Sequence, residues 1–187
     1  MADYMPINTS KQAKVNRIWR FINKSKLFKP IFIYKAIVKL IFTIYKVDQI
    51  IIDFTALKGY QIKPFIASIP FISRSIPIYC KSLFLSDIYS LKYSSENEFI
   101  IKQIETLIGI LPKDKKITIL ADRQFSSKKF IRIFNEKRID FVMRIKENVG
   151  VKIGNKEIVI KDLNGGEYEI EIDGIVCYLY KKEDDRW

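Results

Sequence analysis

The chain has 187 residues, 48% of them hydrophobic, which is enough for one ordinary domain with a real core and argues against a disordered chain. Its net charge of +12 points to a polyanionic partner, either nucleic acid or an acidic membrane surface. The absence of histidine excludes Ser-His-Asp and Cys-His catalysis and histidine zinc sites. Carboxylates that act through hard metal ions are therefore the natural candidates for chemistry.

Two cysteines, Cys80 and Cys177, are the only thiols in the sequence. They are too few for a four-cysteine zinc site. With no secretory signal at the start, we expect a cytosolic chain with free thiols.

Residues 1–46 are polar at first and then basic and apolar. The helical spacing of Ile33, Ile37, Leu40 and Ile44, interrupted by lysines, predicts an amphipathic helix. No window of about 18 residues is free of charge, so we expect no membrane span. A pair of helices packed on the following domain is the simplest interpretation. A DNA-binding arm and a membrane-surface helix remain alternatives.

The next segment reads as three consecutive strands. A near-continuous apolar run over 47–54 has Asp53 near its end, and strand-like patterns follow over 61–69 and 72–80, with turns at 59–60 and 73–75. The connectors are too short for crossover helices, so we expect an antiparallel meander.

A helix with a clear start follows the meander. Ser95 and Glu98 have the spacing of a capping box, an apolar stripe runs from Ile101 to Leu111, and Pro112 ends the helix. We assign no chemistry to this helix.

The run from Lys116 to Lys146 predicts a strand, a helix and a strand. Apolar residues 117–121 end on Asp122, which places a carboxylate at a strand tip. Ser126 and Ser127 can cap a helix whose face carries Phe130, Ile133 and Phe134, and 141–145 returns as a strand. The predicted order is β-β-β-α-β-α-β, an α/β fold with one acid on the first strand and one on the fourth.

Beyond Asn148 the pattern predicts further strands over 156–160, 168–172 and 175–181. Turns over 164–166 and 173–174 separate the last three segments. This part of the chain is therefore expected to be rich in β-structure.

Four motifs resemble the IS4-type insertion-sequence transposases, which have a ribonuclease H-like catalytic domain. They are IIIDFTALKG (50–59), RSIPIYC (74–80), ILADRQF (119–125) and IDFVMRIKENVGV (139–151). The resemblance implies N-terminal helices over 1–46, the first part of a ribonuclease H-like mixed sheet over 47–147 and the start of a β-rich insertion over 148–187. In the fold that it implies, the first and fourth strands lie side by side. Gln124 departs from the family, where glycine is frequent.

The same resemblance implies DNA transposition, a metal-dependent cleavage and transfer of DNA strands. Asp53 and Asp122 are then the catalytic, metal-binding aspartates, and two Mg²⁺ or Mn²⁺ ions are expected in the complete enzyme. The implied partner is the double-stranded DNA of transposon ends, and the implied assembly is a homodimer on paired ends. The implied location is the bacterial cytoplasm, on the nucleoid when the protein is bound to DNA.

These transposases also carry a glutamate on a helix after the β-rich insertion. None of the glutamates after Asn148 falls on such a helix, so none is nominated. We therefore expect a fragment with two of three catalytic carboxylates, whose activity alone is in doubt. A non-catalytic DNA-binding remnant and another ribonuclease H-like nuclease remain alternatives.

Basic residues near the two acids are candidate contacts to DNA phosphates. Arg123 adjoins Asp122, Arg144 and Lys146 end the fifth strand, and Lys128 and Lys129 open the helix after Asp122.

Overall fold

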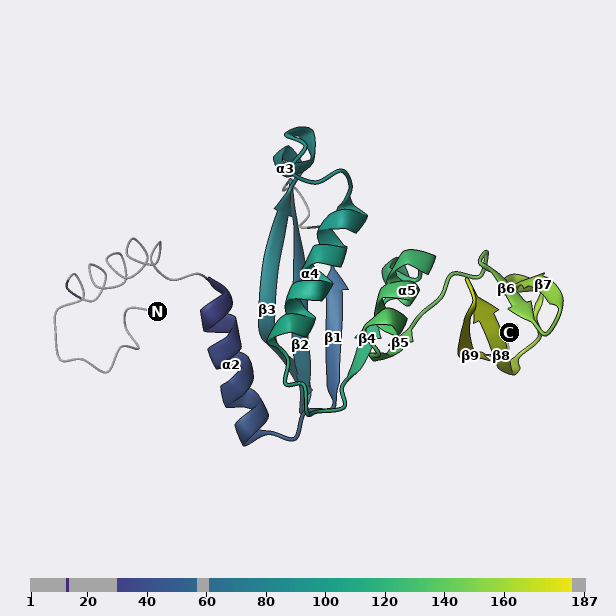
Figure 1. Ribbon diagram of the computed structural model, residues 1–187, viewed down its shortest axis with the longest axis horizontal. Helices are drawn as coiled ribbons and strands as arrows, with labels where there is room; N and C mark the ends of the chain where they lie inside the picture. Colours follow the sequence, from purple (N-terminus) through teal and green to yellow (C-terminus); the bar gives the residue numbers. More distant parts are fainter. Residues whose placement is uncertain (1–12, 14–29, 57–60, 183–187) are drawn as a thin grey trace.

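The computed structural model describes residues 13, 30–56 and 61–182, which form two β-sheets with helices around the larger one (Figure 1). The larger sheet has five strands in the order β3-β2-β1-β4-β5, and the smaller has four in the order β7-β6-β8-β9. The chain is thus a mixed α/β protein, as the sequence pattern predicts.

The larger sheet combines both strand directions. Its strands are β1 (Gln49–Phe54), β2 (Ile62–Phe71), β3 (Arg74–Phe84), β4 (Thr118–Ala121) and β5 (Asp140–Met143). The pairs β1–β2 and β2–β3 are antiparallel, which confirms the predicted meander. The pairs β1–β4 and β4–β5 are parallel, so the first and fourth strands lie side by side.

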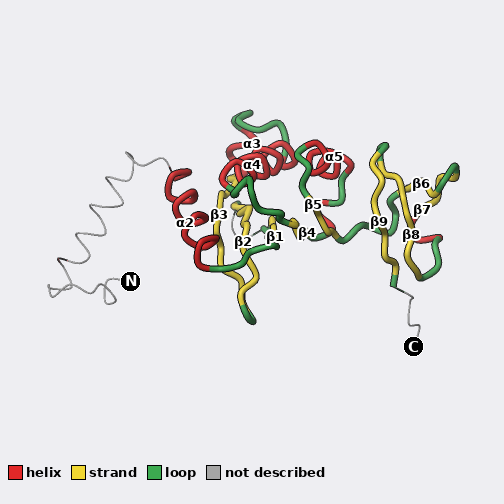
Figure 2. Tube along the Cα trace, turned by 60° about the horizontal axis from the view of Figure 1, so that its bottom comes forward, coloured by secondary structure: helices red, strands yellow, loops and turns green. Residues whose placement is uncertain are grey.

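Helices cover one face of this sheet (Figure 2). They are α3 (Leu85–Tyr89), α4 (Glu96–Ile110) and α5 (Lys128–Glu136), while α2 (Pro30–Ile44) lies beside the edge strand β3. No helix within 30–56 and 61–182 covers the opposite face, where the side chain of Val142 is 61% exposed. The sheet therefore has one packed face and one face without a helical cover.

The alternation of side chains along β1 explains this division. Ile50, Ile52 and Phe54 are buried toward the helices, and the ring of Phe54 lies 5.9 Å from that of Phe99 on α4. Successive side chains of a strand point to opposite faces, so Asp53 points away from α4. The apolar run thus supplies the core while it leaves its carboxylate on the uncovered face.

Helix α5 contributes to two cores. Phe130 and Phe134 belong to the core of the larger sheet, whereas Ile131 belongs to the core of the smaller sheet. Arg132 of α5 also forms an ion pair with Asp173 of the smaller sheet. The second sheet is therefore attached to the first unit by both apolar and ionic contacts of one helix.

The smaller sheet is antiparallel. Its strands are β6 (Gly150–Ile153), β7 (Lys156–Val159), β8 (Gly166–Ile172) and β9 (Ile175–Lys181). The three strands expected after Asn148 are confirmed. The first of them ends earlier than expected, because Ile160 already belongs to the short 3-10 helix η4 (Ile160–Asp162).

The predicted helix near the start is present as α2. Val38 and Ile41 are buried, the Tyr34 hydroxyl donates a hydrogen bond of 2.7 Å to the Cys80 carbonyl, and the Tyr34 and Tyr79 rings meet edge to face at 4.8 Å. The other helix of the expected pair and the turn at 59–60 lie outside the described residues. Among the described helices, none has the length and apolarity to cross a membrane.

Three local features differ from the expectations. Ser127 occupies the N-cap position of α5, but its side chain makes no capping hydrogen bond. The Ser126 hydroxyl donates to the Arg123 carbonyl and therefore does not cap the helix either. Helix α3 and strand β6 were not predicted. Both are short, with five and four residues.

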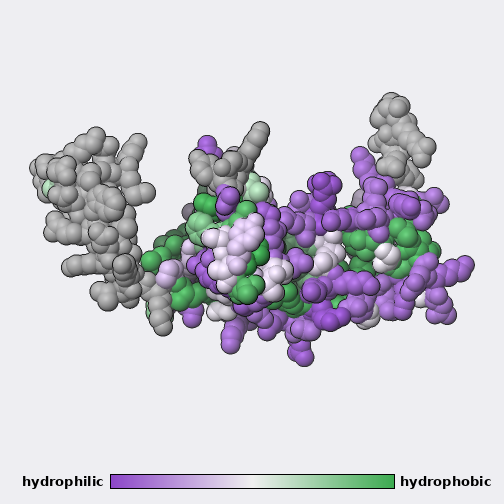
Figure 3. Space-filling view, turned by 90° about the horizontal axis from the view of Figure 1, so that it is seen from above, coloured by the Kyte–Doolittle hydropathy of each residue, from purple (hydrophilic) through white to green (hydrophobic). Residues whose placement is uncertain are grey.

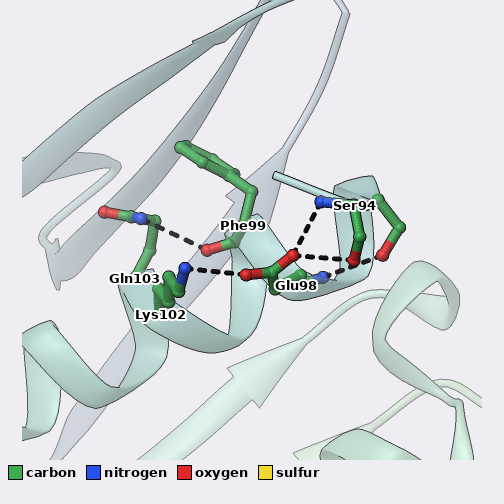
Figure 4. A network of polar contacts seen from close by, with 6 residues as sticks. Ser94, Glu98, Phe99, Lys102 and Gln103 are labelled. Carbon is green, nitrogen blue, oxygen red and sulfur yellow. Dashed lines mark hydrogen bonds and ion pairs between the residues drawn. The ribbon is translucent and has the colours of Figure 1, made fainter. Parts of the chain in front are cut away.

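The N-terminus of α4 is held by a network around Glu98 (Figure 4). The Ser95 hydroxyl accepts a hydrogen bond from the Glu98 amide at 3.2 Å, as the capping box predicts. The Glu98 carboxylate does not return to Ser95. It accepts from the amide and hydroxyl of Ser94, both at 2.7 Å, and from the Lys102 ammonium at 2.7 Å. These contacts lower the pKa of Glu98 to about 2, the hydrogen bond from Lys102 contributing most.

This network predicts a pH-dependent contribution to stability. A pKa below its unfolded value means that the ionised Glu98 stabilises the fold above about pH 4.3 and that this contribution is lost as the pH falls toward 2. Glu98→Gln is therefore expected to flatten the fall of unfolding free energy between pH 4.5 and 2, measured by urea titration at a series of pH values. Glu105→Gln, an exposed site on the same helix, is the matched control. A slope unchanged by Glu98→Gln would contradict the assignment.

Candidate active site

The two candidate aspartates lie at the same end of neighbouring parallel strands. Ile52 of β1 is paired with Ala121 of β4, and each aspartate follows its member of that pair by one residue. Asp122 keeps an extended backbone (φ −77°, ψ 169°), so the alternation of β4 continues through it. Asp53 and Asp122 are therefore neighbours on the uncovered face, on strands about 4.8 Å apart.

Each carboxylate makes one local hydrogen bond. Oδ1 of Asp53 accepts from the Thr55 hydroxyl at 2.8 Å, and Oδ1 of Asp122 accepts from the Arg123 amide at 2.6 Å. The second bond caps the 3-10 turn η3 (Arg123–Phe125), which fixes the chain just after the strand. Both residues are exposed, and within the described ranges Oδ2 of each accepts no hydrogen bond. One oxygen of each carboxylate is thus available to a ligand.

Arg144 lies next to this pair, one residue beyond the end of the neighbouring strand β5. The Arg144 amide donates to the Ala121 carbonyl at 3.2 Å, which extends the β4–β5 pairing by one residue beyond Ala121 and Met143. Arg144 follows the exposed Val142 on the same side of the strand, so it belongs to the uncovered face beside Asp122. Asp53, Asp122 and Arg144 therefore occupy consecutive strand ends.

The other basic candidates are placed differently. Arg123 and Lys146 are exposed, the first within the turn after Asp122 and the second just beyond β5. Lys128 and Lys129 are exposed in the first turn of α5, the helix on the opposite, packed face. Lys128 also lines a cavity of about 920 Å³ between the start of α5 and the smaller sheet. The structure thus groups Arg144 with the acids and sets the two lysines apart.

The donor set fits a hard divalent cation. Mg²⁺ prefers oxygen ligands and is commonly held by one or two carboxylates together with water and substrate phosphates. Asp53 and Asp122 supply two carboxylates, each with a free oxygen. No group of three acidic, histidine or cysteine side chains that could hold a metal ion occurs among the residues the structure describes. For such an ion, Asp53 and Asp122 would be two protein ligands, and the described residues add no third carboxylate beside them.

Thr55 is a member of the site that the sequence pattern did not single out. Its hydroxyl donates to Asp53 and so fixes the orientation of that carboxylate. The only sequence signal for Thr55 is a hydroxyl two residues after an aspartate at a strand end, and this spacing is frequent in ordinary turns.

Viewed from the end of the molecule toward which β1 points, much of the surface is hydrophilic, with a hydrophobic patch over the smaller sheet (Figure 3).

Comparison with known proteins identifies the family of this chain. A family model described as the transposase DDE domain matches residues 82–186, more than half of the 187-residue chain. Asp122 and Arg144 lie inside the matched range, and Asp53 lies before it. Searches of curated proteins and of solved structures gave no match. The match over the larger part of the sequence, together with a carboxylate at the end of β4, shows that this chain belongs to the transposase DDE domain family.

Proposed function

We propose that the protein is a DNA transposase of the IS4 type, with a ribonuclease H-like catalytic domain that cleaves and joins DNA strands with divalent metal ions. Membership of the family indicates transposase function and a DNA substrate, and DDE transposases generally use such ions. The observation that carries the more specific proposal is the adjacency of Asp53 and Asp122 on parallel strands, each with an oxygen free.

Each residue of the site then has a task. Asp53 and Asp122 would hold Mg²⁺ or Mn²⁺, and Thr55 and the Arg123 amide fix the direction of the two carboxylates. The bound ions would activate a water or a 3′-hydroxyl and stabilise the leaving oxygen. Arg144, with Arg123 and Lys146, neutralises the phosphates of the DNA that crosses the uncovered face. We assign Lys128 and Lys129 at most a peripheral contact, because they begin a helix on the other face.

The proposal extends to the organisation of the chain. Residues 47–147 form the first part of the catalytic core, 148–187 the start of a β-rich insertion, and 1–46 a helical region. A third carboxylate, the family's glutamate, completes the site from outside the described residues. Two subunits pair two DNA ends, and the protein acts in the bacterial cytoplasm.

A second candidate is a DNA-binding transposase relative without catalysis. It is favoured by one observation, the absence of a third acidic ligand beside Asp53 and Asp122 within the described ranges. In this case the basic surface would still bind DNA, and the two aspartates would bind a cation weakly.

The experiment is a nicking assay. The purified chain is incubated with supercoiled plasmid in Mg²⁺, in Mn²⁺ and in EDTA, and DNA binding is measured in parallel by fluorescence anisotropy. Because the described residues provide only two of the family's three carboxylates, the proposal predicts slow formation of open circular product, which depends on the divalent ion and is lost in Asp122→Asn. DNA binding without nicking would instead support the second candidate, and no DNA binding would contradict both. An RNA–DNA hybrid serves as a parallel substrate, since its preferential cleavage would identify a different ribonuclease H-like nuclease.

A further inference from the structure

A second concentration of positive charge lies away from the acids. Two loops, one from α4 to β4 and one from α5 to β5, border a cavity of about 280 Å³. Its apolar wall includes Ile108, Leu111 and Ile139. Its border carries five basic side chains, Lys113, Lys115, Lys116, Lys137 and Arg138, which we call the basic pocket. All five are exposed.

The basic pocket lies at the opposite end of the sheet from Asp53 and Asp122. Strands β4 and β5 are parallel, and both loops precede these strands, so the loops meet where the strands begin. The acids lie where β1 and β4 end. Strand β4 has four residues, which span about 13 Å. The two sites are therefore separate surfaces of one sheet, and the α4–β4 loop is at the lower end of the sheet in Figure 1.

The charge of the basic pocket exceeds what the local structure requires. Helices α4 and α5 both end here, and a helix C-terminus carries about half a negative charge, so the two ends require about one positive charge. Asp114 of the same loop and Asp140, which pairs with Lys116 at 3.1 Å, offset two of the five cations. Within these two loops and the lining of the pocket, about two positive charges are left without a counterpart.

The form of the site indicates the kind of anion. The cavity is at the lower limit of the roughly 300–1,000 Å³ typical of small-molecule sites. Its cations come from two loops and are exposed rather than buried in a closed cradle. Arg138 has a positive φ of 53°, and the amides of Arg138 and Ile139 donate to the Asn135 and Phe134 carbonyls at 3.0 and 2.9 Å, which fixes the α5–β5 loop. Exposed cations on fixed loops suit contact with successive phosphates of a nucleic-acid backbone.

We propose that the basic pocket is a second DNA-binding surface, which contacts the phosphate backbone of duplex DNA at the end of the sheet remote from Asp53 and Asp122. The choice of DNA as the polyanion rests on the proposed function. The surface itself does not depend on catalysis, because none of its residues belongs to the candidate active site.

The test is the salt dependence of DNA binding, measured by fluorescence anisotropy with a labelled duplex in EDTA. Each phosphate contact contributes about 0.9 to the slope of log affinity against log salt. A variant with Lys113, Lys115, Lys137 and Arg138 all changed to Gln should lower that slope by about 1.8 if two contacts are lost. Between 50 and 200 mM salt, the unmodified chain should then lose about tenfold more affinity than the variant.

The matched control changes Lys35, Lys39, Lys156 and Lys161 to Gln, four exposed lysines on α2 and the smaller sheet. An equal fall in slope for both variants would overturn the proposal, since it would reflect net charge alone. A lower melting temperature with an unchanged slope would also overturn it, because the cations would then serve only the helix ends. The double variant Lys113→Gln/Lys115→Gln, confined to the α4–β4 loop, keeps the test valid if the fourfold variant does not fold. If the basic-pocket variant keeps the salt slope of the unmodified chain while ion-dependent nicking is intact, the second DNA-binding surface is rejected and the proposed function stands. If the unmodified chain does not bind DNA, both the second surface and the proposed function are rejected.

Discussion

Asp122→Asn is expected to weaken Mn²⁺ binding by about 100-fold or more, and Asp53→Asn by a similar factor. Changes to groups that merely support metal ligands cost about 10- to 100-fold in affinity, so loss of a charged ligand should cost at least as much. Asp53 and Asp122 are the only acidic side chains within β1, β4 and the residue that follows each of these strands. Isothermal titration calorimetry of the single variants and of the double variant measures the effect.

The controls are Asp48→Asn and Asp140→Asn, exposed carboxylates near the opposite ends of β1 and β5. They should bind Mn²⁺ as the unmodified chain does. Without divalent ions, Asp122→Asn should leave the unfolding free energy equal or higher, because neighbouring carboxylates repel one another when no cation lies between them. Equal Mn²⁺ affinity in all variants would remove the basis for the proposed catalytic role.

Phe130→Ala is expected to lower the unfolding free energy by about 3–5 kcal/mol. The Phe130 side chain is fully buried, and its ring lies 5.7 Å from that of Phe125 in the turn that follows Asp122. Truncation would leave a cavity between α5 and that turn. The measurement is a urea unfolding curve followed by circular dichroism.

Phe32→Ala is the matched control, because Phe32 on α2 is 59% exposed. Its effect should stay within about 0.5 kcal/mol. Similar losses for both variants would mean that Phe130 does not support the core as described. Since Phe125 holds the Asp122 turn, Phe130→Ala should also weaken Mn²⁺ binding at a urea concentration where the variant remains folded.

Much of the fold could be predicted because its elements carry clear periodic signals. The apolar run ending near Asp53 and the stripe between Ser95 and Pro112 each contain enough residues to distinguish a strand from a helix. The side-by-side placement of β1 and β4 is different. No local pattern specifies it, and the expectation came from the resemblance to a family, which the parallel register then confirmed.

What could not be predicted depends on contacts between distant segments or on choices within one turn. The Glu98 carboxylate accepts from Ser94 rather than from the Ser95 amide, which the capping-box spacing indicates. Ile131 lies outside the α5 face formed by Phe130, Ile133 and Phe134, and it packs in the core of the second sheet, against which Phe141 and Met143 of β5 also pack. The basic pocket forms only because two loops meet at one end of parallel strands, so sequence order separates Lys113 from Arg138.

The most direct test of a cation shared by Asp53 and Asp122 is the anomalous-difference map of a crystal soaked in Mn²⁺. The proposed site predicts a peak on the uncovered face within about 2.5 Å of one oxygen from each of the two carboxylates. A peak bound by only one of them, or none at that end of β1 and β4, would contradict it.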